Sequence, residues 1–228
     1  MCATCLRPQR TCICRWIAPL ASQIELLILQ HPLEVANAKG SARLLHLCLP
    51  GSVLVAGEAF DGAALHALLH EGGRTPLLLY PEGDAPAPDP AVFETIATGA
   101  TVATVATVAT AATRSALRLV VLDGTWRKSR KMLYLNPQLQ SLPRLALQAM
   151  PQSHYRIRKA HAPDQLSTLE AAAYALQRLG GDETLCERLL CAFDGFVAQQ
   201  AGYVPHPARP AAATVEPIAF SISDLHCI

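Results

Sequence analysis

The sequence predicts an α/β fold in which a mainly parallel β-sheet carries helices on both faces. Short apolar runs alternate along the chain with helical segments of about ten residues, which is the pattern of successive βαβ units. Of the 228 residues, 51% are hydrophobic and 16% are charged, a composition typical of a globular α/β protein. The sequence contains no unbroken apolar run of about 18 residues, so we expect no transmembrane helix.

The strands are predicted from apolar runs that end in turn-forming residues. The first run, QIELLILQ, stops at His31-Pro32 and is typical of a buried strand. Three further runs have the same character, and a shorter one is a candidate fifth strand. In chain order, the five runs cover residues 23–30, 52–56, 76–80, 117–122 and 144–147.

Helices are expected between and after these strands. Helical spacing of apolar residues covers residues 38–49 and 63–69, and a basic helix follows the fourth strand from Thr125 to about Tyr134. The sequence Ser167-Thr168-Leu169-Glu170 has the form of a capping box, and the helix that it opens should stop at Gly180-Gly181. A last helix is expected over residues 183–200.

We divide the chain into a Cys-rich segment (1–20), a main domain (21–202) and a Pro-rich tail (203–228). Residues 100–108 repeat Ala-Thr-Val three times and are treated as an expanded loop without chemistry of its own. The start of the chain is too polar for a signal peptide, which predicts a cytoplasmic protein with reduced thiols. No feature predicts a membrane contact or an obligate protein partner.

Four cysteines stand close together at the start of the chain, in the pattern C-x2-C-x6-C-x-C. Four thiolates within so short a stretch match a closed tetrahedral zinc site, which would fold a segment that has no core of its own. Arginines and Trp16 lie among the cysteines and suit contacts with nucleic acid, whereas the alternative is a purely structural clip. The predicted ligands are Cys2, Cys5, Cys12 and Cys14.

The net charge of +1 hides an uneven distribution of charged residues. Between Asp123 and Asp164 there is no acidic residue, which leaves a locally cationic stretch. Such a stretch indicates a polyanionic partner, although it can also be a solvated face that acids from elsewhere balance. Its basic residues are Arg127, Lys128, Arg130, Lys131, Arg144, Arg156, Arg158 and Lys159.

The segment VVLDGTWRKSRKM places Asp123 at the carboxyl end of a buried strand and Thr125-Trp126 at the start of a helix. Ligands of open α/β sheets bind outside the carboxyl ends of the strands. Asp123 is therefore a candidate carboxylate beside a ligand, and Trp126 a candidate surface for an aromatic base. The alternative is that Asp123 or Thr125 caps the helix while Trp126 packs in the core.

Several motifs in order resemble the DTW-domain family, whose signature D-x-T-W is matched by Asp123-Gly124-Thr125-Trp126. The resemblance covers about residues 1–200. The other matching segments are the Cys-rich start, Gln30-His31-Pro32-x-Glu34, Lys39-Gly40-Ser41-Ala42-Arg43, Tyr80-Pro81, Arg127-Lys128-x-Arg130-Lys131 and Ser167-Thr168-Leu169-Glu170. The family is similar to tRNA-uridine aminocarboxypropyltransferases and is related to the knotted SPOUT-type fold that binds S-adenosylmethionine.

The resemblance implies transfer of the 3-amino-3-carboxypropyl group of S-adenosylmethionine to N3 of a tRNA uridine, with 5′-methylthioadenosine as the leaving group. Asp123 is then the candidate base, Trp126 stacks on the uridine or a neighbouring base, and Thr125 fixes the turn or bonds the ligand. The RNA would lie on the basic run, at Arg127, Lys128, Arg130, Lys131, Arg156, Arg158 and Lys159.

S-adenosylmethionine is expected in the loops that follow the apolar strands, at Gly57-Glu58, Tyr80-Pro81 and Leu122. Ser167 and Thr168 are candidates for its amino-acid end, unless they serve only as the capping box. A group of charged residues near the start of the main domain can contact phosphate or the cofactor carboxylate. The alternative is that these side chains are solvated charges. The group consists of His31, Glu34, Lys39 and Arg43.

Two other functions stay open at this point. The first is an RNA methyltransferase of the knotted class, which uses the same cofactor but transfers the methyl carbon. The second is a non-catalytic, zinc-containing RNA-binding protein. A dinucleotide-binding enzyme is disfavoured because no G-x-G-x-x-G follows any predicted strand.

Overall fold

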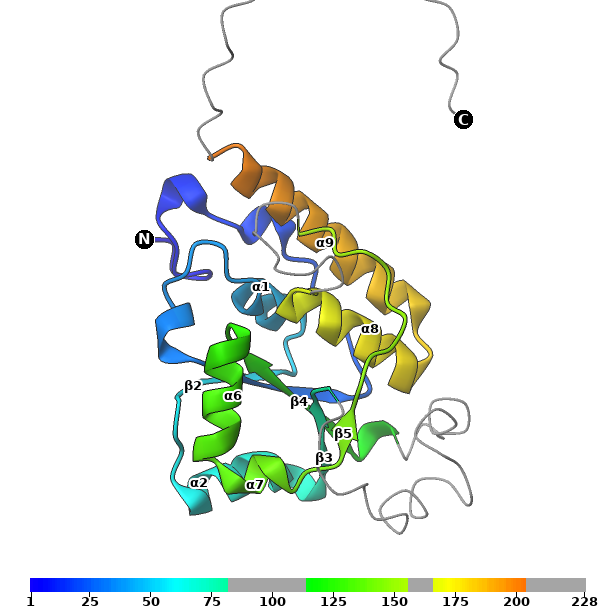
Figure 1. The fold of residues 1–228 in the computed structure, drawn as a ribbon. Helices are drawn as coiled ribbons and strands as arrows, with labels where there is room; N and C mark the ends of the chain where they lie inside the picture. The colour runs from blue at the N-terminus through cyan, green and yellow to red at the C-terminus, as the bar shows by residue number, and fades with distance from the viewer. Residues whose placement is uncertain (82–113, 156–165, 204–228) are drawn as a thin grey trace, which may run out of the picture.

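A single parallel sheet forms the centre of the computed structural model, which describes residues 1–81, 114–155 and 166–203 (Figure 1). Its five strands are ordered β2-β1-β4-β3-β5, and all four neighbouring pairs run parallel. The strands are β1 (Glu25–Gln30), β2 (Val53–Ala56), β3 (Thr75–Leu79), β4 (Leu117–Asp123) and β5 (Arg144–Leu145). The predicted strands and their parallel arrangement are confirmed.

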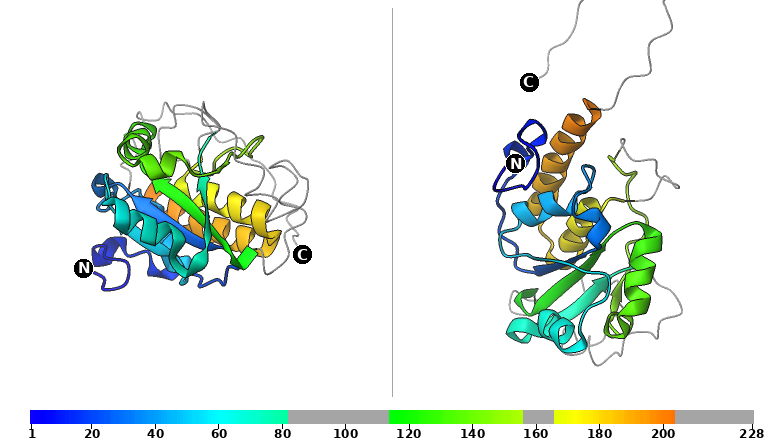
Figure 2. Two further views of the ribbon diagram at one scale, coloured as in Figure 1. Left: turned by 90° about the horizontal axis from the view of Figure 1, so that it is seen from below. Right: turned by 90° about the vertical axis from the view of Figure 1, so that its left-hand side faces the viewer.

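Helices cover both faces of this sheet, as predicted (Figures 1 and 2). One face carries α1 (Ala42–Cys48), α8 (Thr168–Gly180) and α9 (Glu183–Ala201). The other face carries α2 (Gly62–His70), α6 (Trp126–Leu135) and α7 (Pro137–Gln140). No helix in the described ranges is long and apolar enough to cross a lipid bilayer.

Apolar runs form the interior of β1, β3 and β4, because these strands carry helices on both faces. In β4, Leu119 and Val121 face the helices α1, α8 and α9, whereas Val120 and Leu122 face α2 and α6. The alternation in β1 is the same, and every side chain from Leu26 to Gln30 is buried. Two apolar layers, one on each face, therefore hold the sheet in place.

Short 3₁₀ helices complete the described elements. Two lie in the Cys-rich start, at Gln9–Thr11 and Cys14–Trp16; two follow strand β1 and helix α2, at Pro32–Glu34 and Glu71–Gly73. The capping box of α8 forms as the sequence predicts, with Ser167 as the N-cap and Gly181 as a left-handed C-cap. The helix expected at 38–49 begins only at Ala42, and residues 38–40 lie in the loop before it.

The Cys-rich start packs onto the last helix rather than standing apart from the domain (Figure 2). Cys5 and Ile13 are buried in the core that α8 and α9 form with the sheet. Trp16 donates from its indole Nε1 to Gln199 Oε1 at 2.5 Å. Its ring lies against Gly195 so closely that a Cβ there would be 2.2 Å from Trp16 Cε3.

Gly195→Ala tests this contact, because helix propensity and packing predict opposite effects. Alanine in the middle of α9 would favour the helix by about 1 kcal/mol. Displacement of Trp16 should lower the free energy of unfolding by about 1–3 kcal/mol through overpacking. It should also break the hydrogen bond from Trp16 to Gln199. We therefore expect a lower urea midpoint of unfolding for Gly195→Ala than for the unchanged protein.

Gly62→Ala is the matched control, because the nearest atom to a new Cβ there, Gln138 Nε2, lies at an ordinary 3.4 Å. This control should unfold at the wild-type midpoint or above it. An equal midpoint for Gly195→Ala and wild type would show that Trp16 moves away at no cost.

Candidate functional site

The turn after β4 brings the D-G-T-W motif to the carboxyl edge of the sheet. Asp123 is the last residue of β4, and Thr125 is the N-cap of α6, with a side chain that accepts from the Lys128 N–H at 3.4 Å. Trp126 opens the helix and is 46% exposed. The capping alternative therefore holds for Thr125, whereas packing of Trp126 in the core does not occur.

The Asp123 carboxylate is buried and joins three elements. Oδ2 accepts from Gln30 Nε2 on β1 at 2.8 Å, and Oδ1 accepts from the Thr168 hydroxyl at the start of α8 at 2.6 Å. The side chain is only 5% exposed. Asp123 thus links the two central strands to the helix that carries the S-T-L-E motif.

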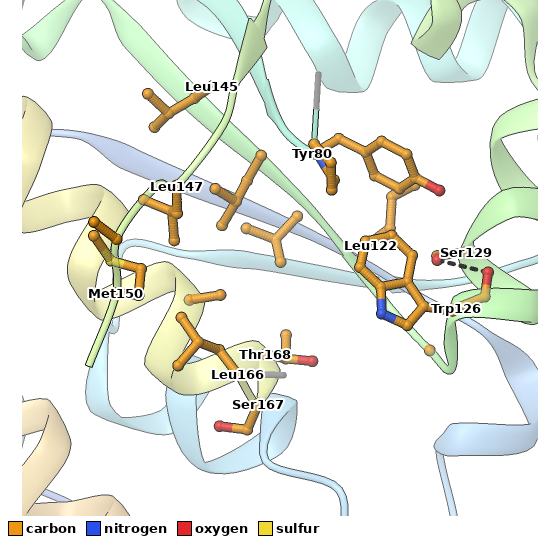
Figure 3. A pocket seen from close by; sticks show the side chains of 16 residues that line it. Tyr80, Leu122, Trp126, Ser129, Leu145, Leu147, Met150, Leu166, Ser167 and Thr168 are labelled. Carbon is orange, nitrogen blue, oxygen red and sulfur yellow. Dashed lines mark hydrogen bonds between the residues drawn. The ribbon is translucent and has the colours of Figure 1, made fainter. Parts of the chain in front are cut away.

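A cavity of about 440 Å³ opens at the carboxyl ends of β3 and β4, beside this turn (Figure 3). Its walls are mostly apolar, and in the described part of the chain no acidic or basic side chain lines it. The larger apolar residues are Leu79, Val121, Leu122, Leu145, Leu147, Met150 and Leu166. Polar or aromatic groups come from Tyr80, Trp126, Ser129, Ser167 and Thr168.

Two aromatic rings stand at one side of the cavity. Tyr80 and Trp126 meet edge to face, with ring centroids 5.7 Å apart and planes at 76° (Figure 3). The Arg144 guanidinium lies over the Tyr80 ring, 5.4 Å from its centroid. Because Trp126 is both exposed and part of the cavity wall, it connects the cavity with the outer surface of α6.

Five of the seven residues expected to bind the cofactor line this cavity: Tyr80, Pro81, Leu122, Ser167 and Thr168. The other two, Gly57 and Glu58, do not line the cavity. They follow β2, which is the edge strand on the side of the sheet away from β3 and β5. Gly57 is held by its N–H to Gln30 O at 2.9 Å, and a Cβ there would be 2.5 Å from the Phe60 ring.

Glu58 belongs instead to a charged group beside α6. It pairs with His31 at 2.9 Å and with Lys131 at 2.9 Å. Hydrogen bonds from Lys131 and then His31 lower the pKa of the Glu58 carboxyl. Nearby, Lys128 Nζ pairs with the buried Glu34 at 2.7 Å.

The early group of charged residues does not converge on the cavity. Arg43 donates to Thr4 O at 2.8 Å and thereby holds the Cys-rich start. The Lys39 backbone O accepts from the Tyr155 hydroxyl. His31 and Glu34 form the pairs described above, so the described contacts of this group lie within the fold and away from the cavity.

The basic run divides into two sets. Arg127 and Arg130 are exposed, whereas Lys128 and Lys131 are paired with Glu34 and Glu58. Acids from elsewhere in the fold thus pair with these two lysines, and no ion pair of Arg127 or Arg130 occurs among the described residues. The remaining expected RNA contacts lie outside the described residues: Arg156, Arg158 and Lys159.

Glu170 has a role that the capping-box motif does not reveal. Its carboxylate accepts from the Ser167 N–H at 2.8 Å, as the box requires, and also from the Ser153 hydroxyl and the His154 N–H at 2.7 Å. The side chain is 1% exposed. Glu170 therefore joins the start of α8 to Ser153 and His154, which lie in the described part of the segment after β5.

Sequence reasoning missed the wall of the cavity that the segment after β5 provides. Leu147, Ala149, Met150 and Leu166 line it, together with Leu145 of β5. These residues carry no motif, because an apolar wall residue and an ordinary core residue have the same sequence signature.

The four cysteines of the start lie together. Their sulfur atoms all fall within 4.8 Å of one another, with Cys2 and Cys14 at 3.5 Å and Cys5 and Cys12 at 3.7 Å. Four ligands at a Zn–S distance of about 2.3 Å would place tetrahedral sulfurs roughly 3.8 Å apart. The group can therefore hold a metal ion of this kind.

The thiols of this group differ in acidity. Backbone N–H groups of Cys5 and Thr4 lower the pKa of the Cys2 thiol to about 6. Burial and the neighbouring sulfurs raise the pKa of Cys14 to about 12. The Cys2 thiolate thus forms more readily than that of Cys14, and a bound cation would favour the thiolate form of all four cysteines.

Among the basic and aromatic residues near the cysteines, Arg7 and Trp16 hold the fold, whereas Arg10 and Arg15 are exposed. Arg7 donates to Ala38 O at 2.5 Å and to Gly40 O at 2.9 Å, and its guanidinium lies 5.2 Å from the Phe196 ring centroid. Trp16 is held by α9, as described above. These contacts favour the structural clip over a direct nucleic-acid role.

The chain resembles curated proteins along most of its length. It is 28% identical over 196 residues to "tRNA-uridine aminocarboxypropyltransferase 2" of Mus musculus, which is 83% of this chain and 59% of that protein. The protein of the same name from Macaca fascicularis matches to the same extent. The Drosophila melanogaster protein of that name is 32% identical over 195 residues, 83% of this chain and 70% of the relative.

This chain therefore spans less than two thirds of the length of the two mammalian relatives. No solved structure matches it significantly. The family model for the DTW domain matches residues 1–201, which include the cysteine group, the D-G-T-W turn and the cavity. On this match, the chain belongs to the DTW domain family.

Proposed function

We propose that this chain transfers the 3-amino-3-carboxypropyl group of S-adenosylmethionine to N3 of a uridine in tRNA and releases 5′-methylthioadenosine. The observation that carries the proposal is the cavity beside the D-G-T-W turn, whose described walls carry no charged side chain, in a chain whose relatives are named for this transfer. Its volume of about 440 Å³ lies in the range of small-molecule sites.

The cavity walls suit the donor molecule. Leu122, Leu145 and Leu147 offer an apolar surface for the adenine and the methylthio group. The sulfonium of S-adenosylmethionine is a cation without N–H donors, and aromatic faces attract such cations. Tyr80 and Trp126 are the aromatic residues at this place, and no carboxylate competes with them along the described walls.

In the proposed transfer, uridine N3 forms a bond to the γ-carbon of the methionine moiety and the bond from this carbon to sulfur breaks. The sulfur keeps the electron pair and leaves as a neutral thioether. The proton of N3 must go to a base. Holding N3 in line with the γ-carbon would supply most of the remaining rate enhancement.

Asp123 is the proposed base, and its surroundings indicate how it would act. It does not line the cavity, but its Oδ1 accepts the hydrogen bond of Thr168, which does. We infer that the Thr168 hydroxyl would take the N3 proton while it passes its own proton to Asp123. The D-G-T-W and S-T-L-E motifs would then form one proton path.

Three substitutions test this path. Asp123→Asn and Thr168→Val should each lower kcat by at least about 100-fold, because each interrupts the transfer of the proton. Thr168→Ser keeps the hydroxyl and should retain most of the activity. The fall of kcat/KM at low pH should be present in wild type and Thr168→Ser but absent in Asp123→Asn.

Other roles of Asp123 give different patterns. If Asp123 contacts uridine directly, Thr168→Val will remain active. If Asp123 only ties α8 to the sheet, both substitutions will lower the unfolding midpoint while the pH profile of the remaining activity stays unchanged.

The transferred group is identified by the position of the label in S-adenosylmethionine. With label on the carboxyl carbon, tRNA should become labelled and 5′-methylthioadenosine should accumulate. With label on the methyl group, tRNA should stay unlabelled. Labelled methyl groups in tRNA together with S-adenosylhomocysteine would establish a methyltransferase instead, and no label from either donor would indicate a binding protein.

We also infer that the ion held by the four cysteines is zinc. An all-sulfur set of ligands with tetrahedral spacing favours zinc over harder divalent cations. The ion would stabilise the start of the chain, which Arg7 and Trp16 connect to the loop at residues 38–40 and to α9. Its proposed role is structural, because the cysteines contribute nothing to the cavity wall.

Metal analysis of the purified protein should give one zinc per chain. The double variant Cys5→Ser, Cys12→Ser should lose the metal and unfold at a lower temperature, because metal binding contributes folding free energy. Cys191→Ser, at an exposed position on α9, is the control and should keep both the zinc and the stability. Zinc retained in the double variant would contradict the assignment.

Several finer expectations stay predictions of this proposal. They are the knotted topology, the division of the chain at residues 20 and 202, and a cytoplasmic location that keeps the thiols reduced. RNA contacts through Arg127, Lys128, Arg130, Lys131, Arg156, Arg158 and Lys159 also belong here. The pairing of the two lysines with Glu34 and Glu58 supports a larger share for Arg127 and Arg130.

A further inference from the structure

The outer side of α6 carries aromatic residues that the fold does not bury. Tyr134 is 78% exposed and Trp126 is 46% exposed. The helix packs on the sheet through Met132, with the partly buried Leu133 beside it, rather than through these two rings. Large aromatic side chains usually contribute to stability by burial, so two exposed ones on a single short helix call for a partner.

The two rings share one face of the helix with two arginines. At 100° per residue, Trp126, Arg127, Arg130 and Tyr134 fall within an arc of about 100°. We call these four residues the α6 strip. Arg127 and Arg130 are exposed, and neither forms an ion pair with a residue in the described ranges.

The acids near α6 do not neutralise the strip. Glu34 and Glu58 pair with Lys128 and Lys131, whose side chains lie outside the arc of the strip. The strip therefore combines flat aromatic surfaces with positive charge that has no ion-pair partner among the described residues. This is the combination that binds the phosphates and the bases of single-stranded nucleic acid.

We propose that the α6 strip binds a single-stranded stretch of RNA adjacent to the target nucleotide. Trp126 stacks on a base at the mouth of the cavity, Arg127 and Arg130 contact the backbone phosphates, and Tyr134 stacks on a second base further along the strand. The inference rests on the proposed function for the identity of the RNA substrate, and it adds the form in which that RNA is bound.

The length of the strip sets the spacing of the two bases. Trp126 and Tyr134 are eight residues apart, which corresponds to about 12 Å along the helix axis. Stacked bases of one strand are about 3.4 Å apart, so the rings receive bases of different nucleotides with at least one phosphate between them. In a duplex the base faces are covered by their neighbours, so only an unpaired strand can use both rings.

The aromatic contact is tested by Tyr134 variants and direct RNA titration without S-adenosylmethionine. Tyr134→Ala should raise the Kd for tRNA and for a short oligouridylate by about 5-fold to 150-fold, the range measured for one base stack. Tyr134→Phe keeps the ring and should bind like wild type, whereas Tyr134→Leu should bind like the alanine variant. Binding of a fully duplex RNA should be the same for all four proteins.

The charge contact is tested by two matched pairs of substitutions. Arg127→Gln with Arg130→Gln should weaken tRNA binding and lower the slope of log K against log salt by roughly 0.7 for each arginine that contacts a single strand. Lys128→Gln with Lys131→Gln should change this slope much less, because these lysines are already paired. Arg188→Gln, exposed on α9, is the control for loss of charge alone.

The outcomes separate this proposal from the transfer reaction. Wild-type affinity for RNA in Tyr134→Ala would overturn the strip, even if the enzyme labels tRNA as proposed. Tyr134-dependent binding of single-stranded RNA without any transfer would support the strip and reject the reaction. A dimer that Tyr134→Ala converts to a monomer, with RNA affinity unchanged, would show that this face binds a second copy of the chain and would also overturn the proposal.

Discussion

The Asp123 carboxylate holds together the elements on which the site depends. From the end of β4 it accepts one hydrogen bond from β1 and another from the start of α8. Residues Gln30 and Asp123 are direct partners in the sheet register, so the two central strands end at the same level. Because β3 and β5 also run parallel to β4, the cavity, the start of α6 and the start of α8 all meet at this edge.

A buried carboxylate that accepts hydrogen bonds from two side chains can both stabilise the fold and take part in chemistry. Loss of Gln30 or Thr168 as a donor would remove one of these hydrogen bonds from the buried carboxylate, which would lower the stability of the fold. The same arrangement keeps Thr168 in one orientation, with its hydroxyl at the cavity wall. The position of the proposed reactive hydroxyl and the stability of the domain would therefore depend on the same few atoms.

The sequence predicted β1, β3 and β4 well because these strands are buried on both faces and so contain continuous apolar runs. It also predicted the turn at Asp123 and the cap at Ser167, which are local features. It could not predict that Gly57 and Glu58 lie away from the cavity, because strand order is not encoded in the spacing along the chain. The late start of α1 has a similar cause, since the carbonyls of Ala38 and Gly40 are held by the distant Arg7.

The contact between Trp16 and Gln199 spans 183 positions of the sequence. During synthesis on the ribosome, the cysteine segment emerges first and α9 only after the whole sheet has been made. Until then Trp16 lacks its partner on α9, so the nascent start of the chain packs incompletely. A metal bound early by the four cysteines would keep the Cys-rich segment folded during this interval. Its packing on α9 would then join two surfaces that are already formed.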